Sequence, residues 1–339
     1  MTRPVRVLVV DDSPAMCRLL SNLLAGDPDV EVVGCAPEPN AARQMIRELQ
    51  PDVLTLDVEM PGMDGLSFLE RIMRLHPMPV VMCSTLTARG TDIAIEALRL
   101  GAVDCIAKPK DAADVAHVGR VLCQTVKAAA GGRIARRIPQ APGPSTGERL
   151  RSDMVIGIGA STGGVEALFH LLPSLPADCP PILVVQHMPA AFTSGFADRL
   201  NKAGALQVHE AHHGQAVLPG HVYIAPGGAA HMLLQADQPP RIRLDPGEPS
   251  GGHRPAVDVL FRSLVALRER AVGVILTGMG EDGAAGLLAM HRAGARTFGQ
   301  SAESCVVFGM PRAAAAIGAV QRQLSLAALP SAIAGACRL

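Results

Sequence analysis

Five side chains in the first third of the chain could together carry out phosphate chemistry. Each stands at the C-terminal end of a short apolar run: Asp11, Asp12, Asp57, Ser84 and Lys108. If these runs are parallel strands, the side chains meet at the sheet edge where such folds bind ligands. Converging carboxylates repel one another unless a cation intervenes, and hard oxygen ligands suit Mg²⁺. Because a single aspartate after a strand is commonly a helix cap, only the whole set predicts magnesium-dependent phosphoryl transfer to an aspartate.

A serine and a histidine occupy similar places in the second half. Ser161 lies where the apolar run 154–160 breaks into a glycine-rich turn, and His187 ends the run 182–187. A strand-to-helix turn exposes a serine near backbone N–H groups, which suits a nucleophile and also suits a phosphate. A histidine, with an ordinary pKa of about 6.5, can serve that serine as a general base.

A third member of this set is expected to be a carboxylate that orients the histidine. The run 272–278 leads to Glu281 and Asp282, and both offer such a group. Acidic residues in loops are commonly solvated or act as helix caps, so position alone does not choose between them. The pattern predicts a nucleophilic serine with a histidine base and an acidic partner.

A dinucleotide-binding fold is the competing interpretation of the same turn. Gly157, Gly159 and the pair 163–164 loosely resemble the glycine pattern that cradles a pyrophosphate. Such a site needs an acidic residue at the end of the next strand to bind the ribose hydroxyls. The next run ends in Gln186 and His187 instead, which favours the hydrolytic interpretation.

The elements that must position these residues alternate in the same order in both halves of the chain. Continuous apolar runs alternate with helix-period segments, which predicts parallel sheets covered on both faces and two doubly wound α/β domains. A stretch rich in Gly, Pro and Arg interrupts the pattern and reads as a flexible linker. The predicted domains are 1–125 and 153–339, with the linker at 126–152.

Composition narrows the class of protein. The 339 residues correspond to about two domains. The 31 basic and 31 acidic residues balance and aromatic residues make up 2%, which argues against nucleic-acid binding. The sequence has no apolar stretch long enough for a membrane span and no signal peptide, so we expect a cytoplasmic protein without membrane insertion. The eight cysteines form no C-x-x-C pair and are expected to be reduced, buried thiols.

Four segments of the first half closely resemble the receiver domain of bacterial response regulators, over about residues 4–125. They are VLVVDDSPAMCRLL, TLDVEMPGMDGLSFL, VVMCSTL and AKPK. The resemblance implies that a histidine kinase phosphorylates Asp57 in the presence of Mg²⁺. It further implies that Asp12, Asp57 and the backbone carbonyl of Glu59 hold the metal and that Asp11 supports it through water.

The second half is similar to the catalytic domain of the chemotaxis protein-glutamate methylesterases, the CheB family. The segments are IGIGASTGGVEAL, VVQHMPAAFTSGFADRLN, VYIAPGG, HRPAVDVLFRS and GVILTGMGEDGAAGL. The resemblance implies a catalytic triad of Ser161, His187 and Asp282 that needs no cofactor. It suggests the backbone N–H of Met279 as an oxyanion donor. Because Ser161 and Thr162 start the helix after the first strand of this half, we add their N–H groups as further donors. His253 and Arg254 are expected to line the substrate cleft.

The two resemblances together imply a methylesterase activated by phosphorylation. Its substrates would be glutamyl methyl esters on chemoreceptors, hydrolysed with release of methanol, and the same acyl chemistry permits deamidation of receptor glutamines. The receiver is expected to obstruct the catalytic edge until it is phosphorylated, in a protein that is monomeric. A catalytically silent adaptor that binds receptors or the kinase is the alternative.

One departure from the receiver pattern concerns signalling. A Phe or Tyr usually stands three residues before the family's lysine, and here that position is Cys105. In the family this aromatic ring moves inward when the receiver is phosphorylated. A cysteine is too small to fill the space of a ring, so this chain cannot signal phosphorylation by such a movement. We expect Ser84 to couple the site to the surface through the following segment 85–90, which includes Leu86.

Overall fold

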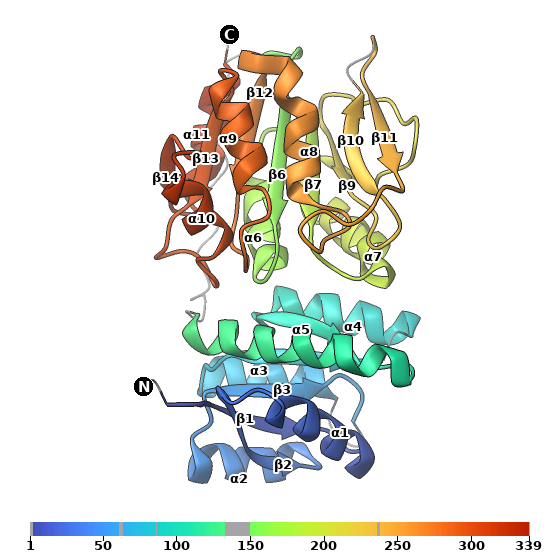
Figure 1. Ribbon diagram of the computed structural model, residues 1–339, viewed down its shortest axis with the longest axis vertical. Coiled ribbons are helices and arrows are strands. Elements are labelled where there is room, and N and C mark those ends of the chain that lie inside the picture. The colour runs from blue at the N-terminus through green and yellow to red at the C-terminus, as the bar shows by residue number, and fades with distance from the viewer. Residues whose placement is uncertain (1–2, 61–63, 86, 133–149, 236–237, 339) are drawn as a thin grey trace. The chain divides into compact units, whose positions relative to one another are not determined.

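The chain folds into two compact units, residues 1–134 and 135–339 (Figure 1). The computed structural model describes residues 3–60, 64–85, 87–132, 150–235 and 238–338. Helix α5 (Ala112–Gly131) continues past the predicted domain boundary at residue 125, because Val126 and Ala129 are buried against the first unit. Residues 133–149 of the predicted linker lie outside the described residues, as does Leu86.

The first unit is built on a five-stranded parallel sheet with the order β2-β1-β3-β4-β5. The order reverses between β1 and β3, which places the ligand-binding crevice of such a sheet beyond these two strands. The strands are β1 (Val5–Val10), β2 (Val30–Ala36), β3 (Val53–Asp57), β4 (Val80–Ser84) and β5 (Asp104–Ala107).

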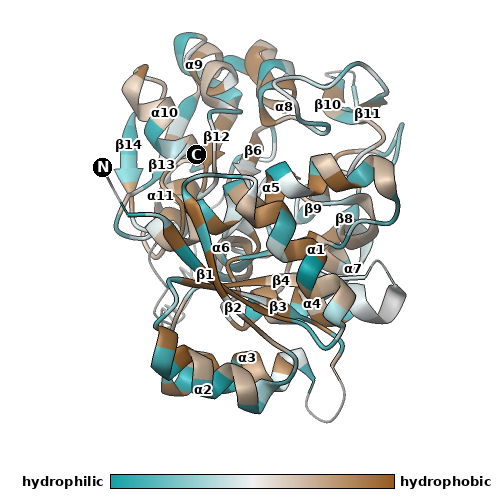
Figure 2. Ribbon diagram, turned by 60° about the horizontal axis from the view of Figure 1, so that its bottom comes forward, coloured by the Kyte–Doolittle hydropathy of each residue, from teal (hydrophilic) through white to brown (hydrophobic). Residues whose placement is uncertain are grey.

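Helices connect these strands and cover the sheet. In Figure 2 the strands β1, β3 and β4 are brown, whereas α2 carries both teal and brown residues. This is the pattern of a sheet whose central strands are buried between amphipathic helices. Short polar side chains cap four of the helices, since Ser13, Asp64, Thr87 and Asp111 each accept a backbone N–H of the first turn. Besides α5 the helices are α1 (Pro14–Ala25), α2 (Pro39–Leu49), α3 (Gly65–Leu75) and α4 (Ala88–Arg99).

The second unit has a seven-stranded parallel sheet with the order β14-β13-β12-β6-β7-β9-β8. The chain moves from β6 toward β7 on one side and later from β12 toward β13 on the other, so the order reverses between β6 and β12. The strands are β6 (Val155–Ala160), β7 (Ile182–Gln186), β8 (Gln207–Glu210), β9 (His221–Ile224), β12 (Ala271–Ile275), β13 (Arg296–Gln300) and β14 (Arg322–Leu324). Two doubly wound parallel-sheet units confirm the predicted fold class.

A separate antiparallel hairpin, β10 (His231–Gln235) with β11 (Arg241–Asp245), accompanies this sheet. The core lies between the sheet and α8, where Leu260, Phe261 and Leu264 are fully buried. The helices are α6 (Gly164–Leu171), α7 (Ala190–Asn201), α8 (Val257–Leu264), α9 (Ala284–Arg292), α10 (Met310–Ala316) and α11 (Leu329–Ala336), with 3₁₀ turns η1 (Leu172–Ser174) and η2 (Val265–Arg270). None of the described helices combines the length and apolar composition needed to cross a membrane.

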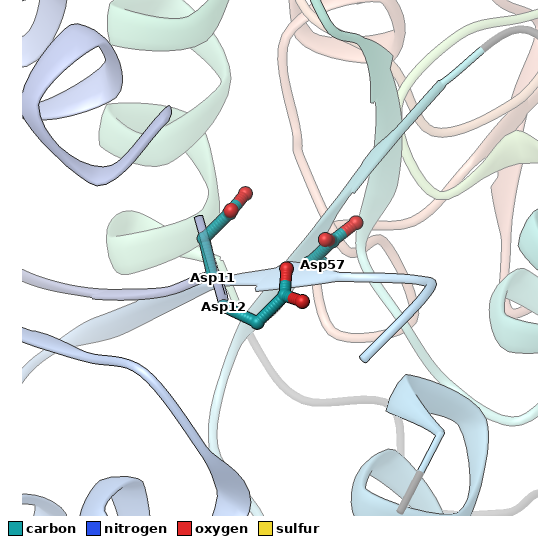
Figure 3. Close-up of side chains that lie close together, drawn as sticks. All are labelled: Asp11, Asp12 and Asp57. Atoms are coloured by element: carbon teal, nitrogen blue, oxygen red, sulfur yellow. The ribbon is translucent and has the colours of Figure 1, made fainter. Parts of the chain in front are cut away.

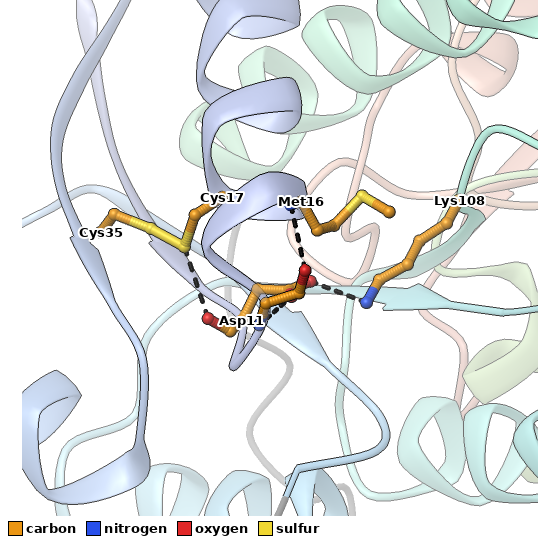
Figure 4. The surroundings of a disulfide bond; sticks show 6 residues. Asp11, Met16, Cys17, Cys35 and Lys108 are labelled. Carbon is orange, nitrogen blue, oxygen red and sulfur yellow. Dashed lines mark hydrogen bonds and ion pairs between the residues drawn. A yellow bond between two sulfur atoms is a disulfide. The ribbon is translucent and has the colours of Figure 1, made fainter. Parts of the chain in front are cut away.

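The expectation that every cysteine is reduced was wrong for one pair, because Cys17 and Cys35 form a disulfide (Figure 4). Cys17 lies in the first turns of α1 and Cys35 near the end of the neighbouring strand β2. The topology brings their Cα atoms to 6.3 Å, which is within disulfide range. Spacing along the chain did not indicate this pairing. The other six cysteines are free and buried, as predicted.

Candidate functional site

The acidic residues predicted in the first unit meet around one lysine. Asp11 follows β1, Asp57 ends β3 and Lys108 follows β5. The Nζ atom of Lys108 lies 2.7 Å from Oδ2 of Asp11 and 2.8 Å from Oδ2 of Asp57. Figure 3 shows Asp12 beside Asp11 and Asp57, and carboxylate oxygens of the three aspartates lie within 4.8 Å of one another.

Burial sets the charges of this cluster. It raises the pKa of Asp57, and the nearby Lys108 offsets that effect only in part. Burial alone would lower the pKa of Lys108, but its hydrogen bonds to the two aspartates outweigh this and raise it. One lysine therefore faces three carboxylates. The donor set fits Mg²⁺, since the cluster offers only oxygen ligands and the exposed Asp12 leaves room for water.

Three further residues singled out from the sequence lie around this cluster. Ser84 is buried at the end of β4, and its hydroxyl donates to the Thr85 carbonyl at 2.9 Å. The N–H of Glu59 donates to Oδ1 of Asp57 at 3.4 Å, so the Glu59 backbone lies next to the predicted phosphoacceptor. Cys105 is buried in β5, and burial raises the pKa of its thiol, which keeps it neutral.

In the second unit, Ser161 and His187 follow neighbouring strands. Ala160 of β6 and Gln186 of β7 are register partners, and the N–H of His187 donates to the Ala160 carbonyl at 3.0 Å. Nε2 of His187 lies 2.8 Å from Oδ2 of Asp282, which follows β12. Nδ1 of His187 is buried and has no hydrogen-bond partner within the described part of the chain. The three residues thus stand where the strand order reverses.

The surroundings of Asp282 distinguish it from Glu281. Asp282 is buried and Glu281 is exposed. The first N–H groups of α8, from Val257 and Asp258, donate to the two oxygens of Asp282 at 2.8 and 3.0 Å. Burial would raise the pKa of Asp282, but the contacts with His187 and these N–H groups outweigh it and lower the pKa. The carboxylate is therefore ionised and points at His187.

Two buried polar residues that sequence reasoning did not assign support this edge. The Nε2 group of Gln186 donates to the carbonyls of Ser161 and His187, at 2.9 and 3.1 Å. Thr277 donates its hydroxyl to the Thr162 carbonyl at 3.0 Å. A polar residue at the end of a fully apolar strand was the available signal for Gln186. Thr277 carried no comparable signal.

The predicted oxyanion donors lie beside Ser161. A Cβ atom on Gly278 would come within 2.7 Å of the Ser161 Cβ, so the chain that leads to Met279 passes directly by Ser161. The Gly278 carbonyl accepts the N–H groups of Gly309 and Met310, which holds this segment in place. Thr162 is buried in the turn after Ser161. The donor roles of Met279, Ser161 and Thr162 stay predictions.

The glycines that suggested a dinucleotide site have another use. A Cβ atom on Gly159 would overlap the side chain of Val257, and one on Gly157 would lie 2.5 Å from Cδ1 of Leu264. Both glycines therefore let α8 pack directly against β6. This close packing also sets the N-terminus of α8 against Asp282, which supports the hydrolytic interpretation.

The side chains of His253 and Arg254, which were expected to line the substrate cleft, contact two different parts of the second unit. The guanidinium of Arg254 donates to the carbonyls of Gly228 and Gly247, at 2.9 and 3.1 Å. Arg254 therefore links the loops that contain these two glycines. The ring of His253 stacks on that of His187, with ring centres 3.9 Å apart and planes 5° from parallel.

Comparisons with known proteins agree with both units. The response regulator receiver domain model matches residues 7–118, and the CheB methylesterase model matches residues 156–333. The protein-glutamate methylesterase/protein-glutamine glutaminase 1 of Caulobacter vibrioides is 52% identical over 335 residues, covering 97% of either chain. Its counterpart from Rhizobium etli is 50% identical over 335 residues, covering 97% of this chain and 95% of that one.

A solved structure is similar to the second unit. The CheB methylesterase catalytic domain of Thermotoga maritima has 37% sequence identity and a TM-score of 0.52. The match covers 54% of this chain and 97% of that one. The arrangement of strands and helices in the second unit is therefore shared with a structure known from experiment.

Proposed function

This chain belongs to the CheB methylesterase family, and on that premise we propose that its second unit hydrolyses glutamyl methyl esters of chemoreceptors and releases methanol. The observation that carries the proposal is the contact of His187 with Asp282, 2.8 Å long, at the reversal of strand order next to Ser161. A buried, ionised carboxylate that holds a histidine beside a serine is the arrangement of a serine hydrolase.

The chemistry follows from these groups. The Nε2–H group of His187 donates a hydrogen bond to Asp282, which leaves Nδ1 as the atom that accepts the proton of the Ser161 hydroxyl. The serine oxygen attacks the ester carbonyl, and the N–H of Met279, with those of Ser161 and Thr162, stabilises the oxyanion. His187 then returns the proton to the departing methoxide. Water hydrolyses the acyl-enzyme by the same route.

The contact between serine and histidine forms only during the reaction in this scheme. Nδ1 of His187 has no hydrogen-bond partner among the described residues, so the hydrogen bond from Ser161 is not formed in the resting chain. Catalytic hydrogen bonds commonly tighten only once substrate is bound.

Deamidation of receptor glutamines is a second activity of the same site. The names of both curated relatives include protein-glutamine glutaminase. The acyl-enzyme formed from a glutamine amide is identical to that formed from the methyl ester, and only the leaving group changes from methanol to ammonia. His187 protonates that leaving group in either case.

The first unit regulates this activity through phosphorylation of Asp57 by a histidine kinase. Asp12, Asp57 and the Glu59 carbonyl would hold Mg²⁺, which when bound neutralises charge on the phosphoryl oxygens. Lys108, already in contact with Asp57, pairs with the added phosphoryl group. Ser84 supplies a hydroxyl that can turn from the Thr85 carbonyl to a phosphoryl oxygen.

Methanol release from methylated receptor membranes tests this function. We expect the full chain to release methanol, and Ser161→Ala to reduce the rate by several orders of magnitude. Ser331→Ala, which changes an exposed serine of α11, is the matched control and keeps the activity. A wild-type chain that binds receptors without releasing methanol would instead be the adaptor.

A further inference from the structure

The stack of His253 on His187 is built by a tight turn. Ser250 and His253 exchange backbone hydrogen bonds, each 3.0 Å long, across Gly251 and Gly252. Both glycines have positive φ, 59° and 83°, which a two-residue turn of this kind requires. The backbone geometry therefore places the histidine directly after the turn, against the face of His187.

Further contacts fix the loop that carries this turn. Arg254 binds the Gly228 and Gly247 carbonyls, and its own carbonyl accepts the Gly228 N–H at 3.1 Å. The buried His231 bridges the loop, since Nε2 contacts the Glu248 carbonyl at 2.9 Å and Nδ1 accepts the N–H of Ala256. With anchors on both sides of the turn, the stacked ring belongs to an ordered segment.

Ionisable side chains lie on two sides of His187. Asp282 lies at its edge, the carboxyl group of Asp258 interacts electrostatically with Asp282, and the ring of His253 covers one face. Burial lowers the pKa of His253, and the adjacent His187 lowers it further, against an opposite effect of Asp282. His253 is therefore neutral at neutral pH. Arg254 points away, to backbone carbonyls.

We propose that His253 is a positioning residue for the catalytic base, acting as a neutral aromatic cover on one face of His187. This inference rests on the proposed function and adds to it a residue outside the triad. The cover fixes the plane of the His187 ring, so that Nε2 stays on Asp282 and Nδ1 stays directed toward Ser161. It also keeps water from that face during proton transfer.

Two substitutions separate the cover from the imidazole chemistry. His253→Ala removes the ring, and we expect kcat for methanol release to fall about 10- to 100-fold with KM within about twofold of wild type, since misplacing a catalytic group costs rate rather than binding. His253→Phe restores a flat neutral face without a titratable group. It should return kcat to within about threefold of wild type.

The pH profile supplies a readout that a purely structural role would not move. Without the cover, water reaches His187 and stabilises its protonated form, so the acidic limb of kcat should shift to higher pH in His253→Ala. In His253→Phe the face stays covered, and the limb should lie nearer to its wild-type position. Ser250→Ala, at the other end of the same turn, controls for disturbance of the loop.

Three results would overturn the proposal: His253→Ala with wild-type kcat, His253→Phe as impaired as His253→Ala, or a loss expressed mainly in KM. The last would make His253 a substrate contact. Failure of the proposed function is distinguishable, because the wild-type chain itself would then release no methanol. Circular dichroism of each variant confirms that the fold is intact before rates are compared.

Discussion

At the scale of single residues, Asp282 links the candidate base to the fold. Its carboxylate accepts hydrogen bonds from the ring of His187 and from the first N–H groups of α8. Asp282→Asn keeps the size but can donate to Nε2, which favours the wrong histidine tautomer. We expect kcat to fall by about 10⁴-fold, as in comparable triads. Glu281→Gln, an exposed neighbour, is the control, and a loss below tenfold in Asp282→Asn would remove the aspartate from the mechanism.

Glu166 in the first turn of α6 gives a prediction about pH. Burial raises its pKa from 4.5 to about 7, so the folded state binds this proton more tightly than the unfolded state. Its protonation therefore stabilises the fold below pH 4.5, and that contribution is lost as pH rises toward 7.

The substitution Glu166→Gln removes this dependence. We expect it to raise stability by about 1–3 kcal/mol at pH 8 and to change it little near pH 4.5. Thermal denaturation of the full chain at the two pH values measures the difference, with Glu281→Gln as the exposed control. An equal gain at both values would contradict the role of ionisation.

The sequence predicted single residues best where a strand ends. Asp11, Asp57 and Lys108 were expected at one edge because the carboxyl ends of parallel strands meet there. In the structure Lys108 contacts both aspartates at that edge. The stack of His253 could not be anticipated in the same way, because it depends on a turn that folds back from a distant part of the chain. The choice of Asp282 over Glu281 rested on family resemblance, and burial supplies its physical reason.

At the scale of elements, burial explains which strands were expected from the sequence. The apolar runs of β1, β3, β6 and β12 are buried on both faces, and this is why they stood out. Edge strands such as β8, with the sequence QVHE, and the partly exposed β11, with RIRLD, carry polar residues and had no such signal. The bond between α1 and β2 also went unforeseen, because it depends on strand order.

Counting the free thiols of the chain tests the disulfide directly. With eight cysteines and one bond between Cys17 and Cys35, six thiols should react with a thiol reagent in the denatured chain without reductant. After reduction the count should be eight. Eight thiols before reduction would show that the pair is reduced in solution, in line with the expectation from the sequence.

At the scale of the whole molecule, the account requires the two units to communicate. A phosphodonor with Mg²⁺ should raise methanol release by the full chain, and Asp57→Asn should abolish the increase. Cys105→Ala should leave the activation ratio largely intact, since its thiol is buried and neutral, whereas Ser84→Ala should weaken it. Loss of activation in Cys105→Ala, with Asp57 still phosphorylated, would show that the thiol takes part in signalling.

The central claim is that Ser161 is the nucleophile activated by His187 and Asp282. The most direct measurement is labelling of the full chain with a fluorophosphonate, with the adduct located by mass spectrometry and methanol release followed in parallel. The account predicts one adduct, on Ser161, absent in His187→Ala, with methanol release lost in proportion to the labelled fraction. A chain fully labelled on Ser161 that still releases methanol at the original rate would contradict it.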